Sequence, residues 1–186
     1  MRVFKYGKLF NYLFPNRVWN YPTKEKIIYL TFDDGPVPEA TPFVLEELNK
    51  VNAKATFFIV GDNVIKNQEI FQQVIANGHR VGNHTMNHVN GKYCRTADYI
   101  QNVSLCQKAI NNQNNKMLFR PPYGKLTKQQ EKTLTDYKII MWSVLGYDFD
   151  PTLSADNCLQ KLIALSKPGS IVLLHDSVKT IQKLRY

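Results

Sequence analysis

The sequence has few cysteines and no long apolar run, and each shortage excludes a class of protein. Its three cysteines, Cys94, Cys106 and Cys158, are odd in number and lack metal-ligand spacing, so a disulfide framework is not expected. Cys106 and Cys158 fall on helical patterns and are predicted to be small core residues. No stretch is long and apolar enough to predict a transmembrane helix.

Acidic residues are also scarce, because 15 Asp and Glu stand against 24 Lys and Arg, for a formal net charge of +9. Such a surplus favours anionic partners such as acidic polymers, nucleic acid or a membrane surface. The basic residues are scattered, however, and no helix-turn-helix, zinc-finger or RNA-binding signature is present. We therefore expect no nucleic-acid partner and interpret most of these residues as solvated surface charge.

The first 20 residues are basic and aromatic, but they have neither a continuous apolar core nor a small-residue cleavage site, so no signal peptide is recognised. Their short apolar spacing favours a helix packed on the outside of the domain over one that contacts a membrane surface or an anionic polymer. The length of 186 residues suits one domain. We divide the chain into an extension packed on the domain, 1–25, and a single domain, 26–186. A soluble monomer is expected, and the compartment stays open.

Apolar segments alternate with helical patterns along the domain. We predict strands over 27–30, 56–60, 79–84, 117–119, 138–144 and 171–174, with helices over 41–52, 69–77, 96–111 and 154–165 and another opening at Thr127. Such alternation implies an α/β fold with parallel strands and crossover helices. The strands do not alternate polar and apolar residues, so both faces of the sheet should be buried.

Two adjacent carboxylates, Asp33 and Asp34, follow the first apolar run in the motif TFDDGP at 31–36. Taken alone, Asp-Asp-Gly-Pro is also good turn chemistry. Neighbouring side chains of a strand point to opposite faces, so only a local twist or bulge would let both acids converge on one centre.

The other polar clusters each follow a separate predicted strand. They are His84 with His88, Arg120, Asp148 and His175. Ligands of parallel sheets and barrels bind at the carboxyl ends of the strands, so we expect these clusters and the two acids to form one site. The remaining histidine, His79, follows a helix-ending glycine and is interpreted as structural.

His84 and His88 have the i, i+4 spacing that places two side chains on one helix face, where both can bind one metal ion. Surface pairs with this spacing are also common. With a strand-end carboxylate, the set becomes two His and one Asp with an open fourth position, which is the ligand inventory of a catalytic zinc site. A metal in such a site lowers the pKa of a bound water to near neutrality.

Five motifs stand in the order and spacing of the polysaccharide deacetylase family. They are TFDDGP at 31–36, HTMNH at 84–88, RPPYG at 120–124, the segment 142–148, and LLHD at 173–176. Over about residues 26–176 the chain resembles the NodB-like catalytic domain of carbohydrate esterase family 4. The resemblance implies a distorted, incomplete (β/α) barrel, a seven-stranded variant of the TIM barrel, which removes N- or O-acetyl groups from polysaccharides.

The resemblance also implies roles for individual residues. Asp33 corresponds to the catalytic base, and Arg120 to the arginine that orients it. His175 corresponds to the general acid, and Asp148 to the carboxylate that orients this histidine. The backbone N–H of Tyr123 corresponds to a donor to the oxyanion. The metal ligands are Asp34, His84 and His88, and the substrate pocket includes Trp142, Leu173 and Pro122. Zn²⁺ suits this ligand set, and Co²⁺, Ni²⁺ or another divalent cation is compatible with it.

Several of these assignments have alternatives. Arg120 would equally fit a surface salt bridge, Trp142 would fit core packing, and Asp150 competes with Asp148 as the partner of His175.

The chain also departs from the family pattern at three places. Leu145 stands where the family commonly has an acid, and Phe149 where it commonly has Trp, so the substrate-side wall is undetermined. The family often has a longer final helix than the residues after Asp176 allow, so we expect a less closed barrel.

The expected activity is metal-dependent hydrolysis of N-acetyl groups in N-acetylglucosamine-containing polymers or oligomers, either peptidoglycan or chitin-like. One alternative is an esterase that removes O-acetyl groups from xylan-type chains. Another is a non-catalytic glycan-binding module, which is disfavoured because both proton-transfer residues, Asp33 and His175, are present. The sequence does not identify the polymer or the length of chain bound.

Overall fold

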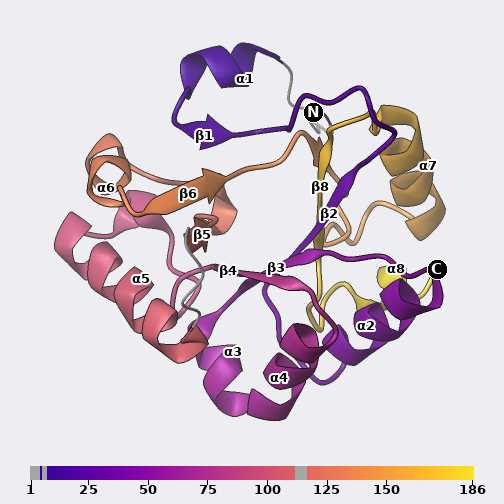
Figure 1. The fold of residues 1–186 in the computed structure, drawn as a ribbon, viewed down its shortest axis with the longest axis horizontal. Helices are drawn as coiled ribbons and strands as arrows, with labels where there is room; N and C mark the ends of the chain where they lie inside the picture. Colours follow the sequence, from indigo (N-terminus) through magenta and orange to yellow (C-terminus); the bar gives the residue numbers. More distant parts are fainter. Residues whose placement is uncertain (1–4, 6–7, 112–116) are drawn as a thin grey trace.

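The protein is built on one curled parallel sheet, which Figure 1 shows as an incomplete barrel. The computed structural model describes residues 5, 8–111 and 117–186. The strand order is β1-β6-β5-β4-β3-β2-β8-β7, and every neighbouring pair is parallel. The strands are β1 (Arg17–Val18), β2 (Tyr29–Asp33), β3 (Thr56–Ile59), β4 (Arg80–Asn83), β5 (Met117–Phe119), β6 (Tyr137–Ile140), β7 (Val144–Leu145) and β8 (Ile171–His175).

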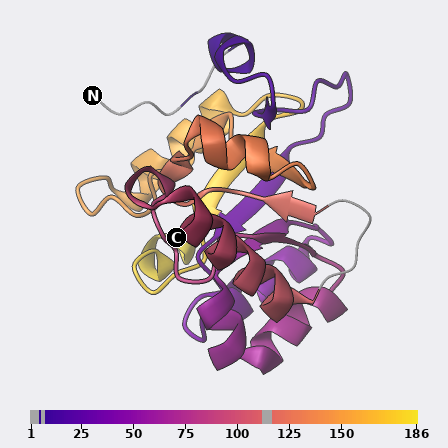
Figure 2. The same ribbon diagram turned by 90° about the vertical axis from the view of Figure 1, so that its left-hand side faces the viewer.

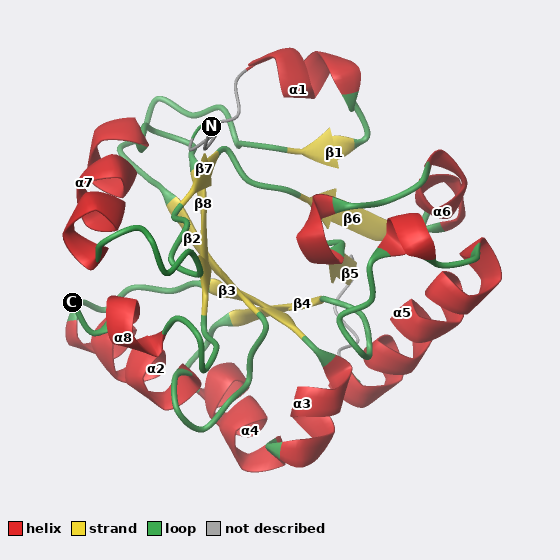
Figure 3. Cartoon of the chain, turned by 180° about the vertical axis from the view of Figure 1, so that it is seen from behind, coloured by secondary structure: helices red, strands yellow, loops and turns green. Residues whose placement is uncertain are grey.

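Helices surround the sheet on its outer side (Figure 3). They are α1 (Lys8–Leu13), α2 (Thr41–Lys50), α3 (Gly61–Lys66), α4 (Gln68–Ala76), α5 (Thr96–Ile110), α6 (Lys128–Thr133), α7 (Ala155–Leu165) and α8 (Ile181–Leu184), with 3₁₀ turns at Gly91–Tyr93 and Pro122–Gly124. The predicted α/β incomplete barrel is therefore confirmed, although the sheet formed by the described residues has eight strands instead of seven. In the described part of the chain, none of these helices combines the length and apolar character needed to cross a membrane.

The core lies on both faces of the sheet, as the continuous apolar strands predicted. Neighbouring β3 residues point to opposite sides, so Phe57 packs with the outer helices and Phe58 inside the barrel. Fully burying one such side chain contributes about 1.5–3 kcal/mol. Cys106 joins the outer cluster and Cys158 is buried on α7, which confirms both as core residues.

Two predicted strands differ from the structure. The first begins at Tyr29 instead of Ile27, because pairing with β8 starts at Tyr29, and the apolar side chains before it are 42% and 45% exposed. The predicted strand over 138–144 is two strands, β6 and β7. The chain leaves β6 after Ile140 and crosses to the other edge of the sheet, where Val144 pairs with β8.

Two features at helix starts were also predicted wrongly or missed. The pair Thr41-Pro42 is typical of an N-cap followed by proline at the first helical position, but Thr41 is itself the first residue of α2, and its hydroxyl donates to Asp176 Oδ2 at 2.6 Å. The six-residue helix α3 was not predicted. The capping box at Thr127 was predicted correctly, since Thr127 and Gln130 exchange side-chain-to-backbone hydrogen bonds.

The N-terminal segment spans the opening of the barrel (Figures 1 and 2). Lys5 forms an antiparallel bridge to Val144 of β7 at one edge, while β1 pairs with β6 at the other edge. Asn20 then bridges Ser170, next to β8. The predicted outer helix is thus limited to α1, and a strand that was not predicted follows it.

Candidate active site

The two neighbouring acids converge because the backbone turns sharply between them. Asp33 is the last residue of β2 and its side chain is buried, while Asp34 has a left-handed φ of 83°. Left-handed backbone is tolerated by Asp better than by most residues. As a result, Asp33 Oδ2 and Asp34 Oδ1 both lie 3.7 Å from His84 Nε2. This turn supplies the local twist that convergence requires.

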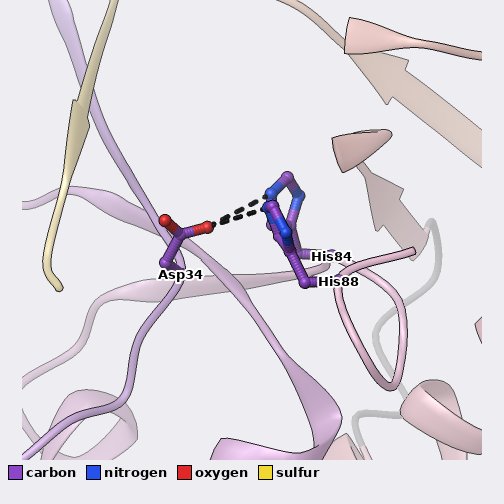
Figure 4. Close-up of side chains that lie close together, drawn as sticks. All are labelled: Asp34, His84 and His88. Carbon is purple, nitrogen blue, oxygen red and sulfur yellow. Dashed lines mark ion pairs between the residues drawn. The ribbon is translucent and has the colours of Figure 1, made fainter. Parts of the chain in front are cut away.

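Three ligand atoms meet beside these acids. Asp34 Oδ1 lies 3.2 Å from His88 Nε2 and 3.7 Å from His84 Nε2 (Figure 4). All three atoms lie within 4.8 Å of one another. His84 Nδ1 donates to the carbonyl of Arg120 at 2.7 Å, which leaves the Nε2 lone pair directed at the cluster. Two imidazole nitrogens and one carboxylate oxygen form a chemically suitable metal site.

The two histidines come from a loop and not from the helix that their spacing predicted. Thr85 and His88 have φ values of 67° and 52°, which no α-helix contains. Asparagine side chains hold the loop instead. Asn83 Oδ1 accepts from Thr85 N, and Asn102 Oδ1 accepts from the backbone N–H groups of Met86 and Asn87. The convergence of the two side chains was predicted correctly, but the predicted local structure was wrong.

The electrostatics of the cluster suit a cation. Burial opposes ionisation of Asp34, but the hydrogen bond with His88 and the nearby imidazoles of His84 and His175 hold its pKa well below the usual range. Burial lowers the pKa of His84, although the two acids oppose the shift, and a lowered pKa favours the neutral imidazole. Deprotonated ligands are what metal binding needs.

Arg120 is completely buried and fixed by four acceptors. Its Nη1 donates to Asp33 Oδ1 at 2.6 Å and to the Thr31 hydroxyl at 2.8 Å. Its Nε and Nη2 donate to the carbonyls of Ile140 and Met141 at 3.0 and 2.8 Å. The guanidinium therefore holds one oxygen of Asp33 and leaves the other, Oδ2, toward His84, so Arg120 is not a surface salt bridge.

His175 and Asp148 form a second polar pair. Asp148 Oδ1 lies 2.8 Å from His175 Nδ1, and Oδ2 accepts from the backbone N–H of the same histidine at 2.6 Å. Asp150 Oδ1 instead accepts two hydrogen bonds from Thr152, so the geometry favours Asp148 as the partner. Burial opposes protonation of His175, but Asp148, with the charges of Asp33 and Asp34, raises its pKa to about 9.

A cavity of about 700 Å³ opens over these groups. Its floor includes the two acids and the three histidines His84, His88 and His175. Its wall is largely apolar and comprises Trp142, Leu145, Tyr147, Phe149, Leu173 and Val178. Of the predicted pocket residues, Trp142 and Leu173 line it, but Pro122 does not, because it is buried in the 3₁₀ turn and Pro121 lies at the cavity instead.

The comparisons with known proteins agree with this geometry. The family model described as Polysaccharide deacetylase matches residues 20–142. A peptidoglycan-N-acetylglucosamine deacetylase of Bacillus cereus is 37% identical over 168 residues, covering 85% of this chain and 76% of the relative. The chain belongs to the polysaccharide deacetylase family.

Other members of the polysaccharide deacetylase family show the same likeness. A chitooligosaccharide deacetylase of a Bradyrhizobium species is 36% identical over 80% of this chain and 70% of its own length. A crystal structure of a peptidoglycan N-acetylglucosamine deacetylase superposes with a TM-score of 0.86 at 30% identity, covering 95% of this chain and 86% of the other. The chain spans only 33% of a Listeria monocytogenes deacetylase, PgdA.

Two of the three departures from the deacetylase family pattern, Leu145 and Phe149, lie on the wall of the cavity. Leu145 is 6% exposed and faces the cavity with an apolar side chain. The Phe149 ring packs edge-on against His175, with centroids 5.2 Å apart, so it keeps an aromatic surface beside the proposed acid. Tyr123, with a left-handed φ of 58°, lies across the cavity against His88, at 4.7 Å between centroids.

Two residues that support the site were not predicted. Asp176 is fully buried, accepts from Gly35 N at 3.1 Å, and has a pKa raised to about 8 chiefly by burial. A Cβ at Gly35 would lie 2.0 Å from Asp176 Oδ2, so this close approach needs glycine. Asn63 Nδ2 donates to the carbonyl of Asp34 at 2.7 Å. Asp176, the last residue of the LLHD motif, could have been predicted as a site residue because it directly follows His175, whereas no sequence signal marks Asn63.

Proposed function

We propose that this protein hydrolyses the N-acetyl groups of N-acetylglucosamine units in peptidoglycan or a chitin-like polymer or oligomer. The observation that carries the proposal is the grouping around one cavity of a three-ligand cluster, an acid held by a buried arginine, and a histidine paired with a carboxylate. These are the parts that amide hydrolysis needs: electrostatic stabilisation, a base and an acid.

Asp34, His84 and His88 are the residues that would hold a divalent cation. Zn²⁺ fits two neutral imidazoles and a carboxylate, and Co²⁺ or Ni²⁺ is compatible with the same donors. When bound, the cation would supply an acidified water and an electrophile for the acetyl carbonyl.

The residues of the chain would handle the protons. Asp33 accepts a proton from the attacking water through the carboxylate oxygen that Arg120 leaves unoccupied. His175 donates a proton from Nε2 to the leaving nitrogen, because Asp148 engages Nδ1 and so selects the tautomer. The Tyr123 backbone N–H would donate to the oxyanion at the edge of the cavity.

A substrate panel separates the proposal from its alternatives. Acetate release would be measured on chitooligosaccharides, peptidoglycan and acetylated xylan with one preparation of the protein. N-deacetylation predicts release from the first two, whereas release from xylan alone would make the protein an O-acetyl esterase. Binding to any glycan without acetate release would instead support a glycan-binding module.

Replacing His175 with alanine should reduce turnover by about 10²- to 10⁴-fold while leaving metal content unchanged, since the residue donates a proton and is not a ligand. Aryl acetates have good leaving groups that need little protonation, so their hydrolysis should fall much less. Turnover on both substrates, with metal analysis on the same samples, checks this. An equal loss on both would contradict the acid role.

Replacing Asp148 with asparagine should move the alkaline limit of activity to lower pH. A general acid works only while protonated, so activity falls as the pH rises through its pKa, which Asp148 helps to raise to about 9. Without that negative charge the pKa of His175 falls. The pH profile of kcat measures the effect, with Asp150→Asn as the matched control. An unchanged alkaline limit of activity in Asp148→Asn would refute the pairing of Asp148 with His175.

A further inference from the structure

Trp142 has two sides, one facing the catalytic cavity and one facing the N-terminal segment. It lines the cavity and is 8% exposed. Behind it lies Trp19, which is 4% exposed and belongs to the same core cluster. The two rings meet edge to face, with centroids 6.4 Å apart and an interplanar angle of 62°. Such an arrangement is favourable for aromatic pairs.

Trp19 is itself held in place by its own segment. The rings of Phe10 and Phe14 lie 4.9 and 6.2 Å from it, between centroids. Arg17 stacks over Phe14 at 4.6 Å and makes a buried ion pair with Glu131 of α6, at 2.6 Å between Nη2 and Oε2. The segment is therefore fixed to the barrel just before Trp19, and the bridge from Asn20 to Ser170 fixes it just after.

The backbone of this segment supports the same part of the site. Met141 N donates to the carbonyl of Val18 at 2.7 Å, and the carbonyl of Met141 accepts from Arg120 Nη2. The peptide between Ile140 and Met141, whose carbonyl accepts from Arg120 Nε at 3.0 Å, thus connects β1 to the arginine that holds Asp33. The N-terminal segment contacts the active site through this peptide and through the Trp19 ring.

We propose that Trp19 is a positioning residue that limits the size of the acyl group by holding Trp142 against the cavity. The inference rests on the proposed deacetylase function and adds a determinant outside the cavity. Truncating Trp19 leaves space behind Trp142, and a core relaxes partly into such a space. Trp142 can then withdraw, so the cavity should accept an acyl group one methylene longer.

The test compares N-acetyl and N-propionyl chitooligosaccharides. In Trp19→Leu and Trp19→Ala, the ratio of kcat/KM for propionyl over acetyl substrate should rise by about tenfold or more, the effect typical of one methylene in an apolar pocket. Tyr12→Ala is the matched control, because it removes an 82%-exposed ring from the same segment and should leave the ratio unchanged. An unchanged ratio in folded Trp19 variants overturns the proposal.

Fluorescence gives a readout that does not depend on activity. The chain has two tryptophans, so Trp142 is the sole source of tryptophan fluorescence in every Trp19 variant. Compared with Trp19→Phe, which keeps a ring, Trp19→Leu should show red-shifted emission and stronger acrylamide quenching. If Trp19→Ala does not fold, the comparison of Trp19→Leu with Trp19→Phe still tests the positioning role. Identical spectra would refute the positioning role, whereas shifted spectra in a protein without deacetylase activity would refute only the proposed function.

Discussion

Replacing Asp33 with asparagine is expected to abolish deacetylation while leaving the metal bound. Asparagine keeps the shape of the side chain, but it cannot accept a proton from water at neutral pH, so turnover should fall by about 10²- to 10⁴-fold. Asp33 is not a member of the three-ligand cluster, so metal content should match that of the wild type. Metal analysis and acetate release on one preparation measure both quantities.

The same substitution should also lower stability. Arg120 is fully buried and Asp33 is its only carboxylate partner among the described contacts. Removing one member of a buried pair typically costs about 3–5 kcal/mol, a large share of the roughly 5–15 kcal/mol that stabilises a domain. Asparagine still offers an oxygen to Nη1, so the loss should fall below that range. A folded, metal-replete and fully active variant would remove Asp33 from the mechanism.

Replacing His84 with alanine is expected to lose the metal and the activity together. A site with three protein ligands can rarely spare one, and even changes to groups that orient ligands cost roughly 10- to 100-fold in metal affinity. His88→Ala and Asp34→Asn should behave alike, because their ligand atoms belong to the same cluster. Metal content of the purified variants, with circular dichroism as a control for folding, checks the prediction.

Asp34→Asn and Asp33→Asn form a matched pair, since the residues are adjacent and the chemical change is identical. A metal-poor Asp34 variant beside a metal-replete Asp33 variant supports the two roles. The reverse pattern would exchange them. Full activity in both variants would show that the two acids of the TFDDGP motif form only a turn and take no part in catalysis.

Much of the site was predictable because it follows from topology. In a parallel sheet, residues that end different strands lie at one edge, so Asp33, His84, Arg120 and His175 meet although 142 positions separate the first from the last. Register then sets their alignment, with Asp33 directly opposite His175 on β8. The apolar runs located the carboxyl ends of the strands, so the residues that meet there could be predicted.

What the sequence did not predict depends on local backbone or on distant contacts. The left-handed Asp34 is held by tertiary hydrogen bonds, since its N–H donates to the carbonyl of Phe58 and its carbonyl accepts from Asn63. For the histidines, spacing alone favoured a helix, whereas His88 is left-handed. Likewise, only the packed structure distinguishes Asp148 from Asp150. The two-residue strand β1 is too short to leave a periodic pattern, although it contacts the peptide that orients Arg120.

Acetate release during stepwise return of Zn²⁺ to the chelated protein tests the central claim most directly. Chitooligosaccharide or peptidoglycan serves as substrate, and metal content is measured at each step. The proposed mechanism predicts no activity without metal and a linear rise that ends at one equivalent, because Asp34, His84 and His88 form one site. Undiminished acetate release from metal-free protein would contradict it.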